Sequence, residues 1–320
     1  MDIFRSVDAV VSASGDGAVD WDAVGDAAKA GTNPGSLDLS AADRQGYAAD
    51  VRDARERIRE VGGVAFDVPE TVELQNRHHW IDANIATFRR LIEPLAEEFD
   101  QPLFPGAARV ANTGSMTFSL AFLARHVLGQ YDPLLLAEGK GSPDHALYFV
   151  HPNIRRTADE LNVDYPRFRR WIAFHEVTHA AEFGTADWLS GYLEERMQSA
   201  ITELSHGGVD RESFTELDAA MTAVEGYAEL LMDRAFDAEY DDLRRKIDAR
   251  RQGGGPVAQL IRRMLGLGLK RRQYERGAAF FTEVADRRGL DTAAKVWDHP
   301  ANLPTGAELD NPENWLARIE

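Results

Sequence analysis

The most constraining feature of the sequence is an H-E-x-x-H motif at residues 175–179, inside a segment, 167–183, that reads as one helix. Four residues of α-helix turn the chain by about 400° and advance it by about 6 Å, so His175 and His179 lie on one face and can bind one ion. Glu176 borders that face. The motif therefore predicts a helix that carries a metal site, and zinc is the ion that this pattern typically binds.

The residues around the motif fit a buried helix with defined ends. Asp164 stands at a plausible start, Pro166 is tolerated in the first turn, and Gly184 stands where a left-handed C-cap would end the helix. Most other side chains in the segment are apolar or small, as in a core helix. We expect this zinc helix at about 165–183. The alternative is a packed helix whose histidines only satisfy hydrogen bonds.

A third metal ligand is expected from a later helix. The metzincin pattern would need Gly and His at the third and sixth positions after His179, where Glu182 and Thr185 stand. A capping box at 213–216, followed by an apolar stripe, predicts a helix at about 214–236. We predict that Glu225, within this segment, is the third ligand.

Two neighbours of Glu225 support this prediction. Glu229 follows four residues later, and we predict that it accepts a hydrogen bond from a ligand histidine and so fixes the tautomer. Gly226 costs about 1 kcal/mol relative to Ala inside a helix, which is explained if another backbone packs closely there. The zinc helix is the obvious neighbour. The alternative is that both glutamates lie on a solvated helix face.

Other residues compete for roles at the site. Asp187 is the alternative third ligand, because the Gly-Thr pair before it resembles the element that carries the aspartate ligand of aspzincins, although at a shorter spacing. Glu182 lies on the stripe of the two histidines, but a turn too far along. His206 and Tyr274 are candidate donors to a tetrahedral oxyanion, and His206 is otherwise a loop residue.

Several further segments carry a resemblance to a known family. They are Arg77–Asn84, Leu128–Asp132, Val150–Ile154, Trp188-Leu189 after the zinc helix, Val224–Gly226, Lys270–Gly277, and a C-terminal set of Trp297, His299-Pro300, Leu303–Thr305, Glu308-Leu309 and Trp315. Together they cover nearly the whole chain from about Val19. The sequence resembles the zincin-like metallopeptidase type 2 family, zinc-dependent hydrolases often associated with biosynthesis of a deazaflavin coenzyme.

The resemblance implies a mainly α fold, a zincin-like metallopeptidase with a small β element beside the H-E-x-x-H helix. It implies one zinc ion on His175, His179 and Glu225, with Glu176 as the catalytic base. It says little about the substrate, because the family is largely uncharacterised and the coenzyme link is one of association.

The rest of the chain reads as helices around one core. Residues 1–40, rich in Asp, Ala and Gly, are expected to form a peripheral N-terminal arm, and 41–320 a single mostly helical domain. The best strand candidate is 146–150. An edge strand beside the metal helix can pair with an extended peptide substrate, so this strand either binds substrate or is simply buried.

Composition narrows the possible partners. The net charge is −17, from 53 acidic and 36 basic residues, and only five of the basic residues are lysine. This surface is expected of a halophilic protein, with an ordinary acidic protein as the alternative. It argues against broad nucleic-acid binding, and we interpret the basic residues at 262–276 as a face that balances neighbouring acids.

The chain has no cysteine, so a disulfide framework and a thiolate metal site are both excluded. The most apolar run, 118–128, is short and interrupted by Arg125 and His126. We therefore expect a cytoplasmic protein without a membrane span.

These observations predict zinc-assisted hydrolysis of an amide bond. A bound zinc ion lowers the pKa of a water molecule to about 7, and Glu176 takes its proton. An intracellular metallopeptidase acting on peptides is the leading interpretation. The alternatives are a zinc amidohydrolase acting on a small metabolite and a non-catalytic zincin-fold binding protein. Glu176 weighs against the last, because a structural zinc site needs no base.

Overall fold

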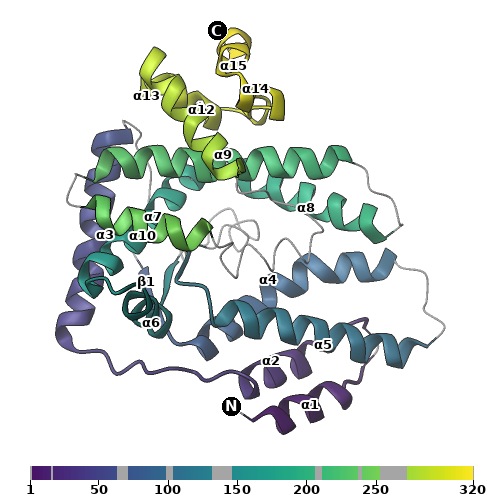
Figure 1. Ribbon diagram of the computed structural model, residues 1–320. Helices are drawn as coiled ribbons and strands as arrows, with labels where there is room; N and C mark the ends of the chain where they lie inside the picture. Colours follow the sequence, from purple (N-terminus) through teal and green to yellow (C-terminus); the bar gives the residue numbers. More distant parts are fainter. Residues whose placement is uncertain are drawn as a thin grey trace.

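The structure is a computed structural model that describes residues 2–15, 17–62, 71–98, 104–131, 146–205, 211–236, 240–252 and 272–319. Figure 1 shows a mainly helical chain with one small sheet, which confirms the predicted fold class. The helices are α1 (Ile3–Val11), α2 (Trp21–Ala30), α3 (Ala41–Gly62), α4 (Arg77–Glu98), α5 (Pro105–Ala124), α6 (His151–Leu161), α7 (Tyr165–Thr185), α8 (Leu189–Ser205), α9 (Arg211–Ala235), α10 (Asp241–Gln252), α12 (Arg272–Arg288), α13 (Leu290–Ala294), α14 (Gly306–Asp310) and α15 (Pro312–Ile319). The strands are β1 (Thr71–Gln75), β2 (Gly129–Tyr131) and β3 (Ala146–Val150).

The motif helix α7 begins where the sequence predicts. The Asp164 carboxylate accepts a hydrogen bond from the Arg167 amide at 3.0 Å, which is the expected N-cap. Its end differs from the prediction, because Gly184 lies inside the helix and Ala186 is the C-cap with φ −110°. The Ala186 amide donates to the Glu182 carbonyl at 2.9 Å, so an ordinary last turn replaces the left-handed one.

The third-ligand helix is α9, and it starts at Arg211, ahead of the predicted capping box. Ser213 therefore lies within the first turn of the helix rather than before it. The close neighbour of Gly226 also differs from the prediction. A Cβ built on Gly226 would lie 2.4 Å from the carbonyl carbon of Gly277 on α12, so α12, and not the motif helix, packs against this glycine. Facing glycines allow the two helix backbones to approach closely.

The sheet has the order β1-β3-β2. β3 pairs in parallel with β1 and antiparallel with β2, so it is the central strand of the described sheet. The predicted strand at 146–150 therefore exists, but it is buried and has partners on both sides. The strand beside the motif helix is β2, because a Cβ on Gly129 would lie 2.6 Å from the Glu176 side chain.

Two hydrophobic clusters organise the helices. The larger surrounds α7 and joins it to α3, α6, α9 and α12, with the buried Leu147 and Phe149 of β3. The smaller joins α2, α4 and α5, which lie together on the side of the molecule near the N-terminus (Figure 1). Among the described helices, none is both long and apolar enough to span a membrane.

Residues 1–40, expected as a peripheral arm, contain α1 and α2. No residue of α1 is buried, whereas α2 places Trp21, Val24 and Ala28 in the smaller cluster. Gly25 allows this packing, because a Cβ there would lie 2.8 Å from the end of the Ile85 side chain. The small residues that suggest a loose segment in the sequence thus serve a close helix contact.

The crossing of α9 and α12 gives a test of this packing. Gly226→Ala is expected to lower the free energy of unfolding by about 1–3 kcal/mol, because the added methyl group overlaps the Gly277 backbone. Gly191→Ala in α8 is the matched control, because no described atom outside its own stretch of helix lies within 4 Å of its Cβ position. The control should be neutral or stabilising by up to about 1 kcal/mol. Urea unfolding followed by circular dichroism measures both, and equal stability of the two variants would contradict the close crossing.

Candidate metal centre

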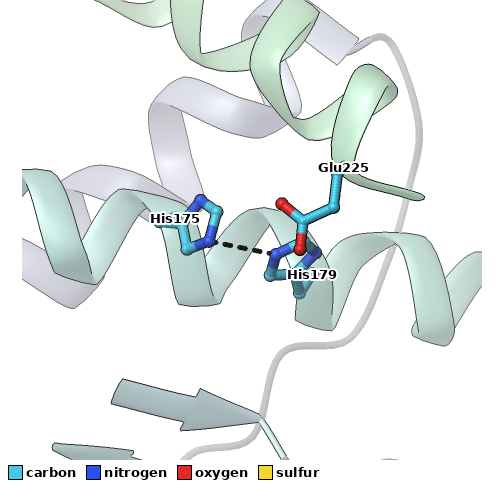
Figure 2. A group of neighbouring side chains, drawn as sticks. All are labelled: His175, His179 and Glu225. Atoms are coloured by element: carbon cyan, nitrogen blue, oxygen red, sulfur yellow. Dashed lines mark hydrogen bonds between the residues drawn. The ribbon is translucent and has the colours of Figure 1, made fainter. Parts of the chain in front are cut away.

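The structure brings together the three side chains that the sequence predicts as metal ligands. Figure 2 shows His175 and His179 one turn apart on α7, with the Glu225 carboxylate reaching toward them from α9. The two Nε2 atoms are 3.2 Å apart. One ligand atom from each of the three residues lies within 4.8 Å of the others, and all three residues are half-buried. The group therefore has the size of a single-ion site.

The donor set and its spacing fit zinc. Zinc–nitrogen bonds of about 2.0–2.1 Å at a tetrahedral angle place two imidazole nitrogens about 3.3 Å apart. The observed separation of 3.2 Å is close to this value. Two histidines and one glutamate are also the ligand set of catalytic zinc sites, which keep a fourth position for water or substrate.

Glu176 is buried beside the three ligands and contacts β2. Its residue is 7% exposed, and the backbone amide of Tyr131 donates a hydrogen bond to its carboxylate. Burial raises the pKa of Glu176 to about 7, with a further contribution from the charge of Glu225, while His179 and the Tyr131 amide oppose the shift. A carboxyl group with this pKa can exchange a proton near neutral pH, as a general base must.

The strand that contacts Glu176 is itself held by buried polar side chains of α4. The Trp80 indole donates to the Gln130 side-chain oxygen at 2.6 Å, and the Gln130 amide donates to Asn84 at 2.9 Å. The Asn84 amide in turn donates to the Trp80 carbonyl at 2.8 Å. These residues belong to two segments that carried the family resemblance, and their contacts fix β2 beside the catalytic candidate.

Among the described hydrogen bonds, the carboxylate that accepts from a ligand histidine is Glu182 instead of the predicted Glu229. His179 Nδ1 donates to Glu182 Oε2 at 2.8 Å, and the Glu182 side chain has no exposed surface. Glu229 instead accepts a hydrogen bond from Arg244 of α10 at 2.9 Å. The reason is geometric: Glu182 follows His179 by three residues on one helix face, whereas Glu229 lies one turn beyond Glu225, toward α10.

The acidic side chains around His179 raise its pKa. Burial opposes its protonation, but the charges of Glu182, Glu225 and Glu176 outweigh this effect and raise the pKa of His179 to about 9. Burial raises the pKa of Glu182 to about 7, although its bond to His179 opposes the shift. A proton on His179 partly balances these carboxylates, and a metal ion bound at Nε2 would replace it.

Of the remaining predicted site residues, Asp187 is the one whose side chain the structure describes. Asp187 is exposed after the end of α7 and is not among the described residues whose ligand atoms come together. His206 lies outside the described residues, and so does the side chain of Tyr274, whose backbone belongs to α12. Most of the basic segment 262–276 is also outside them, but Arg276 pairs with Asp310 at 2.7 Å, as a charge-balancing residue would.

Sequence reasoning missed Glu182 and the two β2 residues, Gly129 and Tyr131, that contact Glu176. Glu182 stands three residues after His179, which is too far along the helix for a ligand to the same metal ion. The same spacing suits a hydrogen bond to Nδ1. For β2 the only signal was the resemblance at 128–132.

Comparisons with known proteins identify a family and a similar solved structure. A solved structure from Chloroflexus aurantiacus, described there as "a putative hydrolase with a novel fold", matches with a TM-score of 0.75 and 29% sequence identity, over 100% of this chain and 98% of that one. A comparison with curated proteins found no match. The sequence matches the zincin-like metallopeptidase family over residues 19–208 and 193–316. The chain therefore belongs to the zincin-like metallopeptidase family.

Proposed function

We propose that this protein is a zinc-dependent hydrolase that cleaves amide bonds in peptides. The observation that carries the proposal is the buried Glu176 carboxylate, held by the Tyr131 amide next to the His175, His179 and Glu225 donor atoms. A group of three protein ligands among the described residues favours a catalytic over a structural site, because structural zinc sites usually have four. A strongly shifted carboxyl pKa beside such a site is also typical of a functional group.

Each residue has a defined part in the proposed reaction. His175, His179 and Glu225 hold one zinc ion, which supplies polarisation of the substrate carbonyl and a lower pKa for a water molecule. Glu176 takes a proton from the attacking water and returns it to the leaving nitrogen. Gly129 leaves room for this carboxylate, because any larger residue would collide with it.

The position of β2 favours a peptide over a small amide. In the described sheet β2 has one strand partner, β3, and it lies against the motif helix at Glu176. An extended peptide that pairs with an edge strand gains main-chain hydrogen bonds without strong side-chain specificity. A peptide bound along β2 would therefore pass close to Glu176. A small-metabolite amidohydrolase is the second candidate.

The proposed ligand set predicts a specific pattern of metal loss. Wild-type protein loaded with zinc should hold about one ion per chain, and His175→Ala or Glu225→Ala should lose it, because two remaining ligands bind zinc weakly. Asp187→Ala is the matched control and should keep the ion. Plasma mass spectrometry after dialysis measures the content. Loss of zinc from Asp187→Ala, with retention in Glu225→Ala, would show that the third ligand is assigned wrongly.

If Glu176 is the catalytic base, replacing it should lower turnover without lowering zinc binding. Glu176→Gln should keep the zinc ion but lose at least about 100-fold in kcat/KM, because the amide cannot take a proton. The assay uses quenched fluorescent peptides and small anilides, in parallel with Asp187→Ala. Activity on anilides alone would favour the second candidate. Full activity of Glu176→Gln, or no turnover by zinc-loaded wild type on either set, would contradict the proposed hydrolase.

A further inference from the structure

Glu182 is a buried carboxylate that contacts the proposed metal site without belonging to its ligands. It follows His179 by one turn of α7, and its Oε2 accepts a hydrogen bond from His179 Nδ1 at 2.8 Å. The other ring nitrogen of His179 lies 3.2 Å from His175 Nε2, on the side of the ligand group. The imidazole of His179 thus has one nitrogen toward the ligands and one toward Glu182.

This orientation decides which nitrogen of His179 carries a proton. A carboxylate has no proton to donate, so it requires a hydrogen on Nδ1 and leaves the lone pair of the neutral ring on Nε2. A metal ion needs that lone pair. A charged acceptor on the far nitrogen also increases the basicity of the ring, which strengthens metal binding.

Glu182 also contacts the helix that supplies the third ligand. The backbone amide of Ala228 on α9 lies close enough to stabilise the charge of the Glu182 carboxylate. Ala228 is three residues after Glu225, so this contact lies one turn from the proposed ligand. One side chain therefore interacts with a histidine of α7 and with the helix that presents Glu225.

The burial of Glu182 is difficult to explain by stability alone. Its side chain is fully buried, and its Oε1 has no hydrogen-bond partner among the described atoms. A buried carboxylate with one unsatisfied oxygen costs folding free energy, and a neutral side chain of the same shape would cost less. A residue of this kind is better explained by a role at the neighbouring site.

We propose that Glu182 is a positioning residue of the metal site, which fixes the Nδ1-protonated form of His179 and joins α7 to α9 at the ligands. This inference rests on the proposed zinc site. It predicts that zinc affinity and folding stability respond differently when the charge of Glu182 is removed.

The test is zinc competition against a chromophoric chelator, with Glu182→Gln and Glu229→Gln compared with wild type. Glu182→Gln should bind zinc about 10–100-fold more weakly, because the charged acceptor is lost. The unfolding midpoint of its zinc-free form should stay the same or rise. Glu229→Gln makes the same chemical change on a carboxylate that binds Arg244, and its zinc affinity should remain close to that of wild type.

A second measurement uses wild-type protein alone and does not depend on the folding of a variant. Nitrogen-15 NMR of the zinc-loaded protein should show His179 protonated at Nδ1 and bound through Nε2. Binding through Nδ1, or unchanged zinc affinity in a folded Glu182→Gln variant, would overturn the role of Glu182 and leave the zinc site standing. Failure of wild type to bind zinc would instead overturn the proposed function itself.

Discussion

The structure depends on the close approach of α7 and α9. It brings two imidazoles and three carboxylates together in the interior of the protein. Glu176 and Glu182 are buried on α7, and Glu225 reaches toward them from α9. Like charges at such short range repel strongly in a medium of low polarity, so this arrangement needs positive charge to be stable. A protonated His179 supplies part of it, and a divalent cation held by His175, His179 and Glu225 would supply more.

The rest of the fold fixes the positions of α9, which carries Glu225, and of β2, which contacts Glu176. On one side, Gly226 and Gly277 allow α12 to cross α9 closely, immediately beside Glu225. On the other side, the polar contacts among Trp80, Asn84 and Gln130 fix β2, whose backbone contacts Glu176. Three of the segments that resemble the family, 77–84, 128–131 and 224–226, therefore lie around the base and the ligands although they are far apart in the sequence. Their common role is to position the base and the ligands.

The features that could be predicted from the sequence are those set by residues close together in the chain. The pairing of His175 with His179, and the N-cap at Asp164, follow from helix periodicity and capping within a few residues of chain. Glu225 is one of several acidic residues on its helix, and its place beside Gly226, in a segment that resembles the family, is what singles it out. The fold class and the strand at 146–150 were also confirmed.

Contacts between elements were not predictable in the same way. Nothing local indicates that Gly226 meets α12 instead of α7, that β3 is central while β2 lies at Glu176, or that Glu229 turns toward Arg244. These outcomes depend on which helices lie side by side, which a single periodic pattern does not specify. Glu182 shows a different limit. Its spacing from His179 is too long for a ligand to the same ion, but this spacing brings its carboxylate to His179 Nδ1.

The most direct test of the account is X-ray absorption at the zinc edge of the loaded protein. A zinc ion held by His175, His179 and Glu225 should show a four-coordinate shell of nitrogen and oxygen at about 2.0–2.1 Å, with scattering from two imidazoles and with one ligand that is not supplied by the protein. A shell of four protein ligands, a shell with a different number of imidazoles, or a protein that takes up no zinc would contradict it.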